Sequence, residues 1–107
     1  MQPGKQTRSE QDWVWVLEQL SRGEEASKLT HTLASRRSDK PNPGYYAQRT
    51  VDMASAHLWL LKGAPIDDVI TMLEVRRRFE IPAVSCSARA REIAQTAQQG
   101  IARKKFA

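Results

Sequence analysis

Positive charge and aromatic rings are concentrated in one short stretch of the sequence, RRSDKPNPGYYAQRTV, which runs from residue 36 to residue 51. Basic side chains can hold phosphates and aromatic faces can stack on unpaired bases, a combination that binds single-stranded nucleic acid. A bend between two helices needs only the prolines and the glycine of this stretch. The other side chains therefore form a candidate binding surface, comprising Arg36, Arg37, Lys40, Tyr45 and Arg49.

A second basic cluster, Arg76, Arg77 and Arg78, extends this candidate surface. Cations at the end of a helix offset the negative end of its dipole by about 0.3–1 kcal/mol, which gives some of these arginines a structural role. That role does not account for three consecutive cations, or for Lys40 and Arg49 beside one bend. Two interpretations stay open: solvated helix ends, or a phosphate-binding surface whose affinity falls steeply with salt.

The overall charge favours a polyanionic partner. The 107 residues, of which 40% are hydrophobic, include 17 Lys and Arg against 12 Asp and Glu, a formal net charge of +5. This balance indicates nucleic acid first and an anionic membrane face second. The sequence has no apolar run of about 18 residues, so we expect no membrane-spanning segment. Its single cysteine, Cys86, excludes an internal disulfide, and we expect a reducing, cytoplasmic compartment.

Residues that could catalyse a reaction do not converge in the sequence. His31 and His57 lie on different predicted helices, and nothing places Cys86 in a nucleophilic triad. Asp67 and Asp68 suit the positive start of a helix, and adjacent helical residues point about 100° apart, which does not suit a metal site. We therefore predict no catalysis by this chain alone, no metal and no cofactor.

Apolar residues recur at helical spacing and never alternate over the length of a strand, which predicts an all-α fold. We expect a compact bundle of about five helices in residues 9–100, between a flexible leader, residues 1–8, and a basic tail, residues 101–107. The expected helices run from a cap at Ser9 to Gly23, from about Ala26 to the arginine pair, from Gly44 or Tyr45 to Gly63, from Pro65 to the arginine triplet, and from Ser85 to Gly100.

An internal repeat is indicated when the sequence is shifted by 40 residues. The shift aligns Leu20 with Leu60, Gly23 with Gly63, Leu33 with Leu73, Arg36 with Arg76, Arg49 with Arg89 and Ala54 with Ala94. Each unit consists of a helix, a Gly turn, a helix ending in arginines, a Pro loop and a further helix. Because the long third helix ends one unit and begins the next, we predict two overlapping three-helix units.

The aromatic residues are expected to divide between core and surface. Tyr45 and Tyr46 are adjacent and point about 100° apart on a helix. Tyr46 lies closer to the apolar stripe of the third helix, so we expect Tyr46 inside and Tyr45 outside as a stacking face. Trp13 falls on the apolar stripe of the first helix. Trp15 does not, and it is either a second packing face or an exposed platform.

Residues 9–54, SEQDWVWVLEQLSRGEEASKLTHTLASRRSDKPNPGYYAQRTVDMA, carry a resemblance to a known family. They contain a Ser-x-x-Asp-Trp start, a Leu-x-x-Gly turn, an Arg-x-Asp-Lys-Pro-Asn-Pro hinge and a Tyr-Ala-x-Arg-Thr-Val helix. This pattern resembles the C-terminal helix-bundle domain of RepB-type replication primases of plasmids and other mobile elements. The residues that match the hinge motif are Asp39, Lys40, Asn42, Tyr46, Arg49 and Thr50.

The resemblance implies a domain that helps a primase engage single-stranded template DNA and start a primer. The polymerising residues of such enzymes belong to a separate catalytic domain, either covalently attached or acting in trans. The alternative is a protein-interaction module that docks on a helicase or another replication protein through a groove or the Trp15 face.

Overall fold

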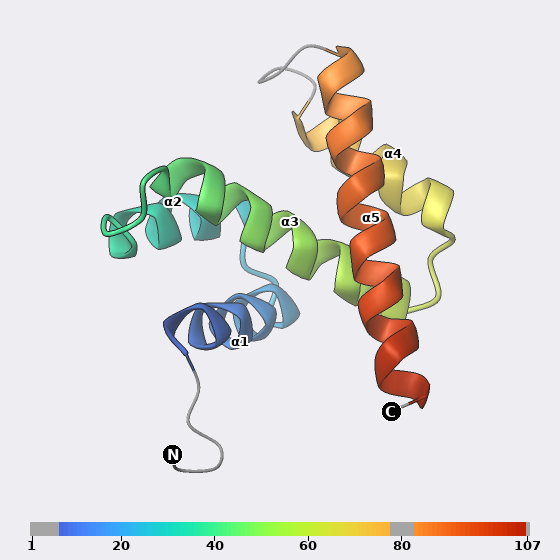
Figure 1. Cartoon of the computed structure of the whole chain (residues 1–107), viewed down its shortest axis with the longest axis horizontal. Helices are drawn as coiled ribbons and strands as arrows, with labels where there is room; N and C mark the ends of the chain where they lie inside the picture. Colours follow the sequence, from blue (N-terminus) through green and yellow to red (C-terminus); the bar gives the residue numbers. More distant parts are fainter. Residues whose placement is uncertain (1–6, 78–82, 107) are drawn as a thin grey trace. The chain divides into compact units, whose positions relative to one another are not determined.

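The computed structural model describes residues 7–77 and 83–106 of the chain. These residues form five α-helices and no strand, so the predicted all-α class is confirmed (Figure 1). In chain order the helices are α1 (Arg8–Ser21), α2 (Ala26–Arg36), α3 (Pro43–Leu61), α4 (Ile66–Arg77) and α5 (Ala83–Phe106).

The helices divide into two units, and the boundary falls inside a helix. Unit 1 is Met1–Val51 and unit 2 is Asp52–Ala107. The division between Val51 and Asp52 lies within α3, so the first part of α3 belongs to unit 1 and the second part to unit 2. This division agrees with the overlap that the 40-residue repeat predicts, in which the third helix ends one unit and begins the next.

The same kind of helix end closes α1 in unit 1 and α3 in unit 2. The φ angle is +91° at Gly23 and +97° at Gly63, a left-handed conformation that glycine adopts readily. The Gly23 amide donates to the Leu20 carbonyl (3.0 Å), and the Glu24 amide donates to the Gln19 carbonyl (3.1 Å). Gly63 and Leu60 repeat this Schellman pattern with the same distances. The repeat therefore extends to backbone hydrogen bonds.

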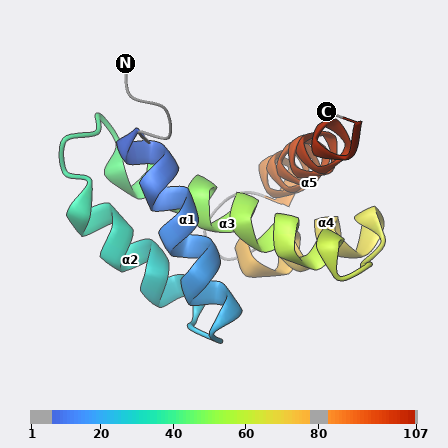
Figure 2. The same ribbon diagram turned by 90° about the horizontal axis from the view of Figure 1, so that it is seen from below.

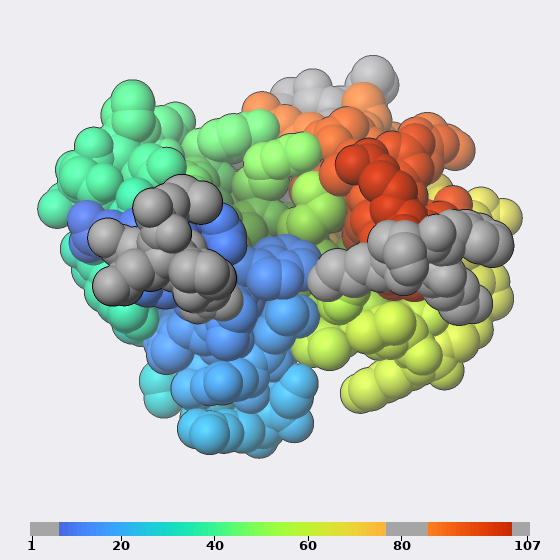
Figure 3. Space-filling view, turned by 60° about the horizontal axis from the view of Figure 1, so that its bottom comes forward, coloured from blue at the N-terminus to red at the C-terminus, as the bar shows by residue number. Residues whose placement is uncertain are grey.

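Each unit buries its own apolar side chains. Figure 2 shows α1 and α2 side by side as an antiparallel pair joined at the Gly23 turn. Unit 1 buries Val16, Leu29, Leu33, Ala47 and Val51. In unit 2, α4 packs against α5 (Figures 1 and 3) in a core of Ala56, Val69, Ile70, Leu73, Ala90, Ile93, Ala94 and Ala97. The 40-residue shift relates Val16 to Ala56, Leu29 to Val69 and Leu33 to Leu73, and all six are buried.

The start of α1 differs from the prediction. The helix begins at Arg8, within the predicted leader, and its cap is Thr7 instead of Ser9. The Thr7 hydroxyl accepts a hydrogen bond from the Glu10 amide (3.2 Å), which caps the helix, and donates to the Glu10 carboxylate (3.1 Å). Asp12, three residues after the predicted cap Ser9, is buried.

The end of α5 also differs from the prediction. The helix continues through Gly100 to Phe106, so the predicted stop at Gly100 is wrong and residues 101–106 prolong the helix. A glycine inside a helix costs only about 1 kcal/mol relative to alanine. The residues around Gly100 are mostly Ala, Gln, Arg and Lys, which favour helix, and no proline follows to end it.

Replacing Gly23 with Ala is expected to lower the free energy of unfolding by about 1–2 kcal/mol, because alanine is strained in the left-handed conformation. No atom beyond the chain neighbours lies within 4 Å of the added methyl group, so the loss reports backbone strain alone. Urea unfolding followed by circular dichroism measures it. Gly100→Ala is the matched control: it lies inside α5 with open space around it and should raise the free energy by about 0.5–1 kcal/mol. If the two substitutions changed the free energy of unfolding in the same direction, the role of the left-handed conformation at Gly23 would be contradicted.

Candidate nucleic-acid interface

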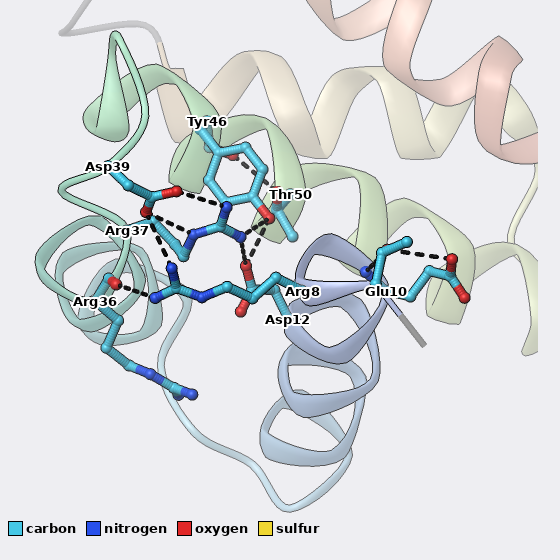
Figure 4. A network of polar contacts seen from close by, with 9 residues as sticks. Arg8, Glu10, Asp12, Arg36, Arg37, Asp39, Tyr46 and Thr50 are labelled. Carbon is cyan, nitrogen blue, oxygen red and sulfur yellow. Dashed lines mark hydrogen bonds and ion pairs between the residues drawn. The ribbon is translucent and has the colours of Figure 1, made fainter. Parts of the chain in front are cut away.

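A buried arginine, Arg37, is the centre of a polar network in unit 1 (Figure 4). Its side chain is only 5% exposed. Nη1 donates to Asp12 Oδ2 at 2.5 Å and to the Tyr46 hydroxyl at 3.2 Å. Nε and Nη2 donate to the two carboxylate oxygens of Asp39 at 3.0 and 3.1 Å. We call these four residues the Arg37 network.

The members of the Arg37 network come from every helical segment of unit 1. Asp12 lies on α1, Arg37 caps the end of α2, Asp39 lies in the following loop and Tyr46 lies in the first turns of α3. The Tyr46 hydroxyl donates to Asp12 Oδ2 at 2.6 Å, which links α3 to α1 directly. The network therefore fixes the ends of three helices around one guanidinium.

Hydrogen bonds and burial shift the pKa values of three members of the Arg37 network. The hydrogen bonds from Arg37 lower the pKa of the Asp39 carboxyl to about 2. The hydrogen bonds to Asp39 and then to Asp12 raise the pKa of the Arg37 guanidinium above its usual value. Burial, and then the hydrogen bond to Asp12, raise the pKa of the Tyr46 phenol. At neutral pH Arg37 is thus a cation, Asp39 is a carboxylate and the Tyr46 phenol is neutral.

The prediction that Arg37 is surplus to the fold is wrong. Its guanidinium is buried and hydrogen-bonded to protein groups on both sides, so in the free protein it is part of the scaffold. The sequence interpretation also missed Asp12, its main buried counter-ion. A signal for Asp12 was present, because the 40-residue shift aligns it with Asp52, another buried aspartate.

Unit 2 contains a similar arrangement around Arg76. Its Nη1 donates to Asp52 Oδ1 at 2.8 Å and to the Ser55 hydroxyl at 3.1 Å, and its guanidinium lies 5.2 Å from the centre of the Trp59 ring. Its side chain is 23% exposed. Arg76 thus has a structural role, and its predicted role in binding stays a prediction. The side chain of Arg77 and the whole of Arg78 lie outside the described residues.

Two predicted cations of the hinge remain outside these carboxylate pairs. Arg36 is exposed, and its guanidinium lies 4.7 Å from the centre of the Trp15 ring. The Lys40 ammonium lies 4.5 Å from the centre of the Tyr46 ring. Within the described residues, neither cation forms an ion pair with a carboxylate. In Figure 4 the Arg36 side chain points away from the Arg37 network.

The structure confirms that Tyr45 lies outside, since it is 45% exposed, while its role as a stacking face stays a prediction. Tyr46 is half-buried, and its hydroxyl reaches Asp12 inside unit 1. Trp15 is half-buried and packs beneath the Arg36 guanidinium, so it is a packing face and not an open platform.

Arg8 is a further cation of this surface that the sequence interpretation missed. Its Nη2 donates to the Arg36 carbonyl at 3.1 Å, and its Nη1 lies 3.6 Å from Asp39 Oδ1. Its side chain is 61% exposed. The predicted cation Arg49 is half-buried on α3. The prediction assigned Arg8 to the flexible leader, and only the helix start at that residue brings it to the hinge.

Most of the residues that carry the family resemblance hold the turn together. Asn42 Oδ1 accepts a hydrogen bond from the Tyr45 amide (3.1 Å) and so caps α3. The Thr50 hydroxyl donates to the Tyr46 carbonyl (2.8 Å). With the two motif residues of the Arg37 network, four of the six form hydrogen bonds that stabilise this turn.

Other site chemistries find no support in the part of the chain that the structure describes. Within residues 7–77 and 83–106, no three His, Cys, Asp or Glu side chains are grouped so that they could hold a metal ion. None of the described helices is both long and apolar enough to cross a membrane. The Cys86 thiol is buried and donates to the Glu74 carbonyl at 3.2 Å.

Comparisons of the chain with protein-family models, curated proteins and solved structures give no match. The resemblance to the primase helix bundle therefore stays a prediction.

Replacing Tyr46 with Phe is expected to lower the free energy of unfolding by about 1–2 kcal/mol, because the buried Asp12 loses a hydrogen bond from the hydroxyl. Chemical denaturation measures the change. Tyr45→Phe is the matched control, since its ring is 45% exposed and surface changes usually stay within about 0.5 kcal/mol. Equal losses in the two variants would contradict the role of the Tyr46 hydroxyl.

Acid is expected to weaken unit 1 through Asp39. Its pKa of about 2 in the folded chain lies below the unfolded value of about 3.9. The carboxylate therefore stabilises the fold above about pH 4, and this contribution is lost as the pH falls toward 2. The thermal unfolding midpoint of the wild type should fall more steeply between pH 4 and pH 2 than that of Asp39→Asn. Parallel curves for the two proteins would show that Asp39 is not the titrating group.

Proposed function

We propose that unit 1 binds single-stranded DNA through Arg36 and Lys40, with Tyr45 as a stacking face, as an accessory domain of primer synthesis in plasmid-type replication. The observation that carries the proposal is the division of charge at the hinge. The carboxylates of the Arg37 network are bound to Arg37, and the two neighbouring cations lie over aromatic rings without a carboxylate partner among the described residues.

The placement of these cations suits contacts with phosphate. Arg36 is fixed from two sides, because its carbonyl is held by Arg8 and its guanidinium lies over Trp15. Lys40 lies over the ring of Tyr46, which is itself held by the Arg37 network. A cation that is already ordered loses less conformational entropy when a phosphate binds.

The exposed tyrosine favours a single strand over a duplex. Tyr45 stands in the first turn of α3, and nearly half of its surface is accessible. Unpaired bases can stack on such a ring for about 1–3 kcal/mol each, whereas paired bases are already stacked on their neighbours. A strand whose phosphates contact Arg36 and Lys40 could place a base on Tyr45.

The assignment to primer synthesis depends on the resemblance of residues 9–54. It implies a primase catalytic domain, covalently attached or in trans, as the second partner. The alternative protein-interaction module was expected to dock through a groove or the Trp15 face, and the Trp15 ring lies under the Arg36 guanidinium. A protein that retained a replication partner in a pull-down and bound no oligonucleotide would favour that alternative, with a helicase as the first partner to test.

Fluorescence anisotropy with a labelled oligothymidine tests the proposal. Each phosphate contact contributes about 0.7 to the slope of log affinity against log salt concentration for a single strand. The Arg36→Ala/Lys40→Ala variant should therefore bind more weakly than the wild type, with a slope that is about 1.4 smaller. Arg37 is left intact because its removal would disturb the fold.

The matched control is Lys28→Ala/Lys62→Ala, which removes the same charge at two exposed positions. Lys28 lies eight residues before Arg36, and Lys62 lies in unit 2. The control should keep most of the wild-type affinity. Equal losses in both double variants, or a wild type that binds no oligonucleotide at low salt, would overturn the proposal.

A further inference from the structure

The Arg37 guanidinium has one edge held in the core and one edge covered by the partly exposed carboxylate of Asp39. Nη1 is anchored by Asp12, whose side chain is only 5% exposed, and by the Tyr46 hydroxyl. The opposite edge, formed by Nε and Nη2, is bound by both oxygens of Asp39. Two parallel N–H donors of this kind can bind the two oxygens of either a carboxylate or a phosphate. The orientation of the outer edge does not depend on Asp39, because the inner edge is fixed.

Asp39 differs from Asp12 in its position. Its side chain is 49% exposed, and it lies in the loop between α2 and α3. One buried cation needs one counter-charge, and Asp12 already supplies it inside unit 1. Asp39 is thus a second carboxylate on the same guanidinium, and solvent reaches it without any opening of the core.

A second cation faces the same carboxylate. Arg8 Nη1 lies 3.6 Å from Asp39 Oδ1, the oxygen that also accepts from Arg37 Nε (Figure 4). Lys40, the next residue in the chain, lies over the Tyr46 ring, and the Arg37 guanidinium lies 5.1 Å from the centre of the same ring. The Asp39 carboxylate therefore faces two cations, Arg37 and Arg8.

We infer that Arg8 and the outer edge of Arg37 form a phosphate site, which the carboxylate of Asp39 fills in the free protein and a backbone phosphate of a bound strand takes over. This inference deepens the proposed function and rests on it for the identity of the ligand. Asp39 then acts as an internal competitor that lowers the affinity for nucleic acid. The exchange replaces one bidentate anion by another, so Arg37 keeps its hydrogen bonds and its place in the fold.

Removing the competitor tests the inference. In Asp39→Ala the outer edge of Arg37 and the Arg8 guanidinium become accessible, and the affinity for labelled oligothymidine should rise by about tenfold at low salt. The slope of log affinity against log salt concentration should increase by about 0.7, for one additional phosphate contact. Asp39→Asn keeps the side-chain volume and one acceptor oxygen and should give a smaller rise. Arg8→Ala in the Asp39→Ala background should remove the gain.

The control for net charge is Glu18→Gln, which removes one negative charge from an exposed position on α1. Its affinity should rise less than threefold. A gain in Asp39→Ala no larger than in this control would overturn the inference. Unfolding of both Asp39 variants, seen by circular dichroism, would also overturn it, because Asp39 would then be a structural counter-ion.

Inorganic phosphate provides a readout that does not need nucleic acid. It should raise the thermal unfolding midpoint of Asp39→Ala at constant ionic strength and leave that of the wild type almost unchanged. If the wild type binds no oligonucleotide but phosphate stabilises Asp39→Ala, the proposed function fails and the anion site stands. If oligonucleotide binds the wild type and neither probe distinguishes Asp39→Ala from Glu18→Gln, the anion site fails alone.

Discussion

The burial of the Arg37 guanidinium is the constraint on which unit 1 depends. A guanidinium stays charged and carries five N–H donors, so removing it from water is costly unless those donors are satisfied. Its partners come from α1, from the loop after α2 and from α3, so the cost is offset only when these segments meet in one arrangement. Within the described residues, no buried side-chain nitrogen or oxygen lacks a hydrogen-bond partner. The buried polar contacts of unit 1 therefore help to determine how its helices are arranged.

Unit 2 satisfies the same constraint with a shifted arginine. By the 40-residue repeat, Asp12 corresponds to Asp52 and Arg37 corresponds to Arg77, yet the partner of Asp52 is Arg76. Arg37 caps α2, whereas Arg76 still lies within α4. Adjacent side chains on a helix point about 100° apart. Of two adjacent arginines, either one can therefore be the residue that points toward the buried aspartate of its unit. In each unit, one arginine of the pair thus forms an ion pair with a buried aspartate.

Much of the fold could be predicted from the sequence, because its signals are local. The helical period, the glycine ends at Gly23 and Gly63 and the outward position of Tyr45 each depend on residues within a few positions. The role of Arg37 could not be predicted in that way, because its counter-ion Asp12 lies 25 residues earlier on another helix. A terminal arginine that offsets a helix dipole and one that enters the core have the same local pattern. The cap at Thr7 places Asp12 inside α1, where it pairs with Arg37.

The scaffold and the surface of unit 1 are coupled through consecutive residues. Arg36 and Arg37 are adjacent, and Asp39 and Lys40 are adjacent, so each pair contributes one member to the Arg37 network and one cation to the surface. The Arg37 network therefore fixes the positions of Arg36 and Lys40. A ligand that binds those cations gains from this order, because the entropy cost of placing them has been met during folding. By the same coupling, a ligand that displaced Asp39 would act on the loop that carries Lys40, and binding and stability of unit 1 would change together.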